Sequence, residues 1–120
     1  MNNEIVSVDL RTRTKRFALR IIRLYTALPN SNSAQVIGKQ VLRCGTSVGA
    51  HYREASRARS DAEFISKLEV ALQELDEAAY WLELLVESEI VAAEMLAELR
   101  DEANQLLAIL VACVKNVKKQ

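Results

Sequence analysis

The chain has 120 residues, half of them hydrophobic, and its three Gly and one Pro are too few for a strand-rich fold. Its longest purely apolar run, residues 106–114, is too short to cross a bilayer, and its first residues do not form a secretory signal, so we expect a cytoplasmic protein without membrane contact. The net charge is zero, yet residues 1–60 carry +8 and residues 61–120 carry −8, which favours either pairing between the halves or an anionic partner such as nucleic acid.

Apolar residues at three- and four-residue spacing predict two helices in the basic half of the chain. The first spans about residues 9–28, where Asp9 can cap its start and the only proline follows its end. The second spans about residues 33–57, with Ser33 or Asn32 as its cap. All three glycines of the chain fall within this second helix.

Two further helices are predicted in the acidic half. Ser60 and Glu63 fit the capping-box pattern, which starts a third helix over about residues 61–87. A fourth helix spans about residues 91–117. No Gly or Pro marks the connection between them, but the apolar pattern breaks at residues 88–91, so we expect a turn there.

The four segments together predict the fold. Their apolar residues repeat every 3.5 residues on average, which indicates a left-handed supercoil, and the short connections force neighbouring helices to run antiparallel. We therefore predict one all-α domain over residues 1–120, an antiparallel up-down-up-down left-handed four-helix bundle. Gly45 and Gly49 should let another helix pack closely. Cys44 and Cys113 fall in the apolar pattern and are expected to be small core residues rather than a disulfide or a redox pair.

One set of side chains on the second helix resembles a catalytic site. Ser47, His51 and Glu54 share one helix face, in the order nucleophile, base and orienter. Amides in the middle of a helix are already bonded within it and cannot stabilise an oxyanion, so a polar layer in or beside the core is the favoured interpretation. The chain has one His, no paired short Cys spacing and no Gly-rich phosphate loop. We therefore predict no enzyme activity, no metal and no cofactor.

Basic residues form two stripes at helical spacing, one on each of the first two helices. If the stripes are adjacent, they make a basic surface suited to contacts with phosphates that are sequence-tolerant and sensitive to salt. The alternatives are a solvated face, ion pairs with the acidic helices, or docking on the acidic surface of a second copy. The predicted phosphate contacts are Arg13, Arg16, Arg20 and Arg23, the first basic stripe, and Lys39, Arg43, Arg53 and Arg57, the second basic stripe.

Three segments of the chain resemble a known family. Residues 42–55 read LRCGTSVGAHYREA, residues 60–68 read SDAEFISKL and residues 77–82 read EAAYWL. They resemble the four-helix-bundle proteins encoded within 23S rRNA intervening sequences, over about residues 15–90. Relatives of that family include the accessory proteins of diversity-generating retroelements.

The resemblance implies a bundle that assembles as a ring-shaped homopentamer and has no catalytic activity. In the retroelement branch it also implies that a basic surface binds nucleic acid, RNA or DNA, and a reverse transcriptase. Ser47, Glu54, Lys67 and Trp81 match the core of the family motif, and His51 stands where the family often has Asn, which favours a hydrogen-bonding role. We further expect Lys67 to pair with Glu54 across two helices. A protein–protein adaptor or scaffold, whose basic and acidic faces mediate assembly without nucleic acid, is the alternative function.

Overall fold

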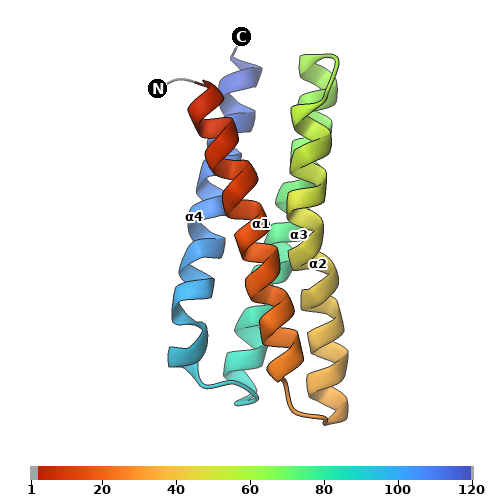
Figure 1. The fold of residues 1–120 in the computed structure, drawn as a ribbon, viewed down its shortest axis with the longest axis vertical. Coiled ribbons are helices and arrows are strands. Elements are labelled where there is room, and N and C mark those ends of the chain that lie inside the picture. The colour runs from red at the N-terminus through yellow and green to blue at the C-terminus, as the bar shows by residue number, and fades with distance from the viewer. Residues whose placement is uncertain (1–2, 120) are drawn as a thin grey trace.

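The computed structural model describes the backbone of residues 3–119 and the side chains of residues 9–119. It contains four helices, α1 (Asn3–Ala27), α2 (Asn32–Ser56), α3 (Asp61–Glu87) and α4 (Ala93–Lys118). Figure 1 shows that each helix runs antiparallel to the one before it. The predicted all-α, up-down-up-down four-helix bundle is therefore confirmed; the handedness of its supercoil stays a prediction.

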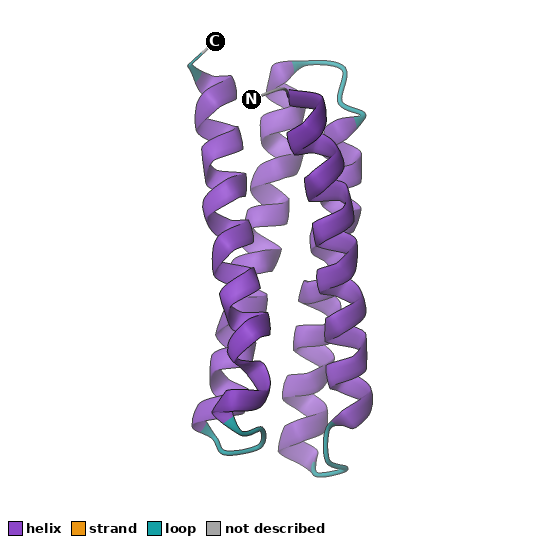
Figure 2. Cartoon of the chain, turned by 60° about the vertical axis from the view of Figure 1, so that its left-hand side comes forward, coloured by secondary structure: helices purple, strands orange, loops and turns teal. Residues whose placement is uncertain are grey.

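The helices form a closed square about 48 Å long and 22 by 20 Å across. α1 packs on α2, α2 on α3 and α3 on α4, whereas α4 closes back on α1 with the thinnest contact of the four. The α1–α2 and α3–α4 connections lie at one end, and the α2–α3 connection lies at the other (Figure 2). Within the described residues, no helix combines the length and apolar character needed to cross a bilayer.

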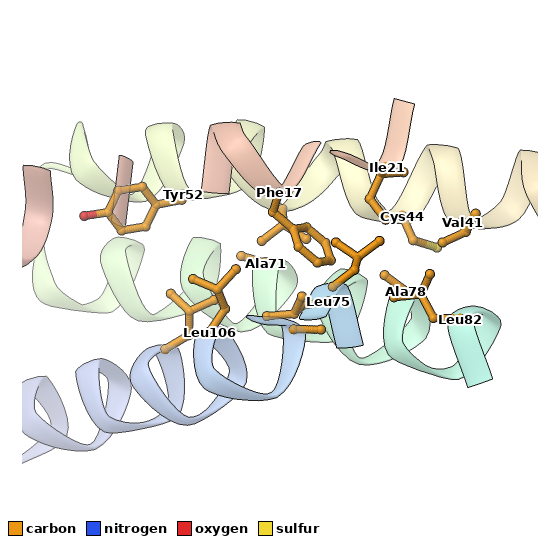
Figure 3. Packing of buried hydrophobic residues seen from close by; sticks show 14 of the residues in the cluster. Phe17, Ile21, Val41, Cys44, Tyr52, Ala71, Leu75, Ala78, Leu82 and Leu106 are labelled. Atoms are coloured by element: carbon orange, nitrogen blue, oxygen red, sulfur yellow. The ribbon is translucent and has the colours of Figure 1, made fainter. Parts of the chain in front are cut away.

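The core follows the heptad pattern most strictly on α3. There the fully buried residues come at alternating spacings of three and four, and they meet the buried rows of the other helices along the bundle axis (Figure 3). Thr14 is the one buried polar residue among the described side chains, and its hydroxyl donates to the carbonyl of Leu10 at 2.8 Å. The α3 row consists of Leu68, Ala71, Leu75, Ala78, Leu82 and Leu85.

The starts of α1 and α2 differ from the prediction. Asp9 does not cap α1, which begins at Asn3, because no Gly or Pro interrupts the segment before it; the Asp9 carboxylate instead lies 3.6 Å from Arg13, one turn further on. The cap of α2 is Ser31, whose hydroxyl accepts from the amide of Ala34 at 3.3 Å. Ser31, Asn32 and Ser33 are all favoured cap residues, so their side-chain types do not distinguish among them.

The start of α3 is as predicted. The Ser60 hydroxyl accepts from the Glu63 amide at 3.1 Å, as expected of the cap. The Glu63 carboxylate, however, accepts from the amide of Arg59 at 3.3 Å, one residue before the usual capping-box partner. The helix begins at Asp61 and ends at Glu87, the predicted bounds.

The α3–α4 connection is built without glycine. The Ile90 amide donates to Leu85 O at 3.1 Å and the Glu89 amide to Val86 O at 3.0 Å, the bond pattern of a Schellman motif. Glu89 occupies the left-handed position that this motif requires, with φ 63°. The turn therefore forms at the predicted place, but α4 begins at Ala93, two residues later than expected.

The glycines of α2 allow α1 to approach closely, as the sequence predicts. A Cβ at Gly45 would lie 2.7 Å from Cγ1 of the buried Ile21, and one at Gly49 would lie 3.3 Å from Oγ1 of Thr14. Gly45 and Gly49 thus sit at the α1–α2 contact itself, and their contacts set the register between the two helices.

Gly45→Ala should lower the free energy of unfolding by about 1 kcal/mol. Overpacking against Ile21 costs more than the roughly 1 kcal/mol that Ala gains over Gly in a helix. Gly49→Ala is the matched control, because its contact is looser and the gain in helix propensity should offset it. Urea unfolding at one protein concentration measures both, and a Gly45→Ala variant more stable than Gly49→Ala would contradict the assignment.

Glu89→Gly should raise the free energy of unfolding by about 1 kcal/mol, because glycine adopts a positive φ without the Cβ clash that Glu89 suffers. Glu83→Gly, in the interior of α3, should instead lower it by about 1 kcal/mol. Thermal and urea unfolding of the two variants test this contrast. A loss of stability in both would show that the turn tolerates Glu89 without strain.

Candidate nucleic-acid interface

The first basic stripe faces α4. The Arg13 guanidinium donates to both carboxylate oxygens of Glu102, at 3.1 and 2.6 Å, and to Gln105 at 3.1 Å. Arg16 and Arg20 follow Arg13 by three and seven residues, so they share its side of α1. The stripe therefore borders the α1–α4 contact.

The second basic stripe lies on the other side of α1. Gly49 of α2 packs on Thr14 of α1, and Arg53 follows Gly49 by one helical turn. α1 stands between α2 and α4 in the bundle (Figure 1), so the two stripes border opposite sides of it. The glycine contacts and the Glu102 contact thus direct the two stripes toward different neighbours of α1, and the expectation that they form one continuous surface stays a prediction.

Two of the predicted phosphate contacts are already paired within the molecule. The hydrogen bond that Arg13 donates to Glu102 raises the pKa of Arg13, and both side chains are largely shielded from water. Arg43 donates to Glu74 at 3.2 Å and to Glu77 at 3.1 Å. A phosphate would have to displace these carboxylates, so we assign Arg13 and Arg43 to holding helices together. Sequence analysis missed the partners because they depend on the register between helices far apart in the chain.

The other six predicted contacts are free. They are exposed or half-buried, and no carboxylate among the described side chains lies within ion-pair distance of any of them. Such residues can neutralise phosphates without breaking an internal contact. The six are Arg16, Arg20, Arg23, Lys39, Arg53 and Arg57.

Cys44 takes part in the cluster around Arg43. Its Sγ donates to Glu77 at 3.2 Å and accepts from the Arg43 guanidinium at 3.2 Å. Its sulfur and the carboxylates of Glu74 and Glu77 lie within 4.8 Å of one another, close enough to resemble a metal site. However, burial and the neighbouring Glu77 raise the pKa of the Cys44 thiol to about 12, and the guanidinium already bonds all three groups. The cluster is therefore best explained as an α2–α3 packing contact.

The nucleophile–base contact expected of a catalytic set is absent among the described residues. The Ser47 hydroxyl donates to the carbonyl of Arg43 at 2.6 Å, so its proton is used within its own helix. Nδ1 of His51 is buried without a hydrogen bond there, and it lies 3.8 Å from the Glu54 carboxylate. Glu54 connects to α3 instead, through Lys67 at 3.2 Å. The predicted Glu54–Lys67 ion pair is present, and the polar layer forms mainly through it.

Trp81 lies beside Tyr80 on α3. The two rings meet edge to face with centroids 5.2 Å apart. Nε1 of Trp81 is buried and has no hydrogen bond within the described residues, while Tyr80 is 53% exposed. Trp81 is therefore a packing residue of the α3 surface.

The comparisons with known proteins agree with this fold. The family model described as 23S rRNA-intervening sequence protein matches residues 7–112. A crystal structure from Bacteroides thetaiotaomicron, described as a protein of unknown function from the S23 ribosomal protein family, is 38% identical. The match covers 91% of this chain and 97% of that one, with a TM-score of 0.85. A search of curated proteins gives no significant match.

Glu54→Gln should lower the melting temperature at neutral pH but not in acid. Lys67, by its hydrogen bond and its charge, lowers the pKa of Glu54 in the folded state. The ion pair therefore stabilises the fold at pH values above the pKa that the Glu54 carboxyl has in the unfolded state. This stabilisation is lost as the pH falls through the lower pKa that the carboxyl has in the folded state. Melting curves from about pH 7 to about pH 3 measure this difference. Glu83→Gln, which removes an exposed carboxylate without a described ion pair, is the control; an equal pH dependence in both variants would rule out the pair.

Proposed function

Because the chain belongs to the 23S rRNA-intervening sequence protein family, we propose that it is a non-enzymatic, homo-oligomeric nucleic-acid-binding protein. The observation that supports this most directly is the group of six unpaired basic residues on α1 and α2. In the same molecule Arg13 and Arg43 have found carboxylate partners, whereas these six have none among the described side chains. Unpaired cations on one half of a protein suit a polyanion.

The binding we propose is led by the phosphate backbone. The two tyrosines on the basic helices are not placed to stack on bases: Tyr52 is buried in the core, and Tyr25 is half-buried with its hydroxyl 3.4 Å from Gln35. Sequence-tolerant recognition of RNA or duplex DNA follows, with a strong dependence on salt.

We also propose that the protein assembles with itself, as a ring-shaped pentamer. Large apolar side chains remain exposed on the single chain, among them Ile22 at 43%, Val36 at 63% and Met95 at 74%. Exposed apolar residues of this size suit a subunit interface. By the family resemblance, the assembly acts as an accessory factor to an rRNA intervening sequence or to a reverse transcriptase.

A protein–protein adaptor is the second candidate function. One observation favours it: a groove of about 290 Å³ between α3 and α4 contains two carboxylates without an ion-pair partner among the described residues. Arginines of the first basic stripe on a second copy could dock there. The groove is lined by Asp76, Ala79, Tyr80, Glu83, Arg100 and Asn104.

Binding of labelled structured RNA and labelled duplex DNA, measured by anisotropy, separates the two functions. The logarithm of affinity should fall linearly with the logarithm of salt between about 50 and 200 mM, with a slope near −5 for duplex DNA if all six residues contact phosphates. Light scattering in the same buffers records the oligomeric state.

The absence of binding at about 50 mM salt, with the oligomer intact, would reject nucleic-acid binding and favour the adaptor. A monomer that binds with the expected slope would reject the pentamer alone. The two parts of the proposal are therefore tested separately by one set of measurements.

A further inference from the structure

We propose that the phosphate-binding site is a patch across the α1–α2 contact, formed by Arg11, Lys15, Arg53 and Arg57, and that its ligand is a nucleic-acid backbone. The inference rests on the proposed function and assigns it to a surface. Only Arg53 and Arg57 of this group belong to the two basic stripes. We name the group the seam patch.

The close packing of α1 on α2 brings the four residues together. A Cβ on Gly49 would come within 3.3 to 3.6 Å of Thr14, side chain and backbone alike. The helices are antiparallel, so Arg11, three residues before Thr14, is level with Arg53, four residues after Gly49. These two arginines flank the contact from opposite helices, and both are exposed.

Lys15 and Arg57 extend the patch along each helix. Each lies four residues from its partner, about 6 Å along the helix axis, and both are exposed. A nucleic-acid strand carries one charge per about 3.4 Å of its axis, so either pair spans about two phosphates. No described carboxylate pairs with any of the four.

The described carboxylates of α1 and α2 nearest the seam patch are directed elsewhere. Asp9 lies on the α4 side of α1, next to Arg13. Glu54 pairs with Lys67 of α3. The described part of the seam patch therefore contains four positive charges and no negative one, which gives it a positive potential.

Stabilisation of a helix end explains only part of the patch. Arg53 and Arg57 lie at the C-terminal end of α2, where positive side chains are favoured by the helix dipole. Arg11 and Lys15 lie in the interior of α1, where that effect is negligible. A role in binding an anionic ligand accounts for all four residues, including the two in the interior of α1.

The first basic stripe is the less suitable site. Arg16, Arg20 and Arg23 border α4, where Glu102 and, one turn before it, Glu98 present carboxylates on the same side. Glu102 is paired with Arg13, but Glu98 has no described ion pair, so a phosphate there would meet an unpaired carboxylate. Asp9 and Glu54, beside the seam patch, each lie against a cation. The first basic stripe contains three free arginines, as the seam patch does, but it has carboxylates beside it. It is therefore a matched control.

Two triple variants with equal changes in net charge test the proposal. One replaces Arg11, Lys15 and Arg53 by Glu, and the other replaces Arg16, Arg20 and Arg23 by Glu. We expect the seam variant to bind duplex DNA and RNA at least about 30-fold more weakly at about 100 mM salt. The slope of the logarithm of affinity against the logarithm of salt should become less negative by about three. The control variant, which removes three free arginines outside the seam patch, should lose at least about threefold less affinity than the seam variant.

Equal losses in the two variants, or a larger loss in the control, would overturn the seam patch while leaving the proposed function in place. A wild-type protein that binds no nucleic acid would instead overturn the proposed function itself. Circular dichroism and light scattering establish that each variant is folded and assembled as the wild type is. If the Glu variant does not fold, the variant with Gln at Arg11, Lys15 and Arg53 should reproduce the loss of binding in weaker form, and wild-type affinity in that variant would overturn the proposal.

Discussion

The contact between α1 and α2 at the glycines determines how the rest of the molecule is arranged. Gly45 and Gly49 accept the side chains of Ile21 and Thr14 at distances that any larger residue would disturb. A shift of α1 by one turn would bring one of these side chains onto the other glycine but would place the second against Val41 or Arg53, which carry a Cβ, so size complementarity selects one register. That register also fixes the rotation of α1, and with it which of its charged residues face α2 and which face α4.

The rotation of α1 divides its basic residues by environment. Arg13 meets Glu102 at the α1–α4 contact and becomes part of the packing, while Arg11, only two residues away, is left on the α2 side without a described partner. Arg43 of α2 is also part of the packing, because it forms ion pairs with Glu74 and Glu77 of α3. Opposite charge between the halves of the chain is thus used twice, for internal ion pairs and for an unneutralised surface.

Sequence patterns predicted the fold because each signal was local. The heptad rows, the Ser60 cap and the break after Glu87 depend on residues within a turn or two of one another, and the structure has all three. The cap of α2 was misplaced because Ser31, Asn32 and Ser33 are all favoured at that position, so local preference does not distinguish among them. The partners of Arg13 and Arg43 could not be predicted, since each pair joins helices whose rotation depends on contacts elsewhere. A stripe on a helical wheel shows which residues share a side, but not which neighbour that side meets.

The position of Trp81 gives the protein an internal optical reporter. It is the only tryptophan in the chain, so intrinsic fluorescence excited in the indole band comes from one site on α3. Its ring is half-buried and its Nε1 is shielded, so its emission depends on an intact α2–α3 packing and shifts to the red when water reaches the indole. Arg43 pairs with Glu77, so the level of Trp81 on the antiparallel α2 is near Lys39, about 21 Å along the helix from Arg53 of the seam patch. Unfolding of the bundle and occupancy of the seam patch can accordingly be followed independently in the same sample.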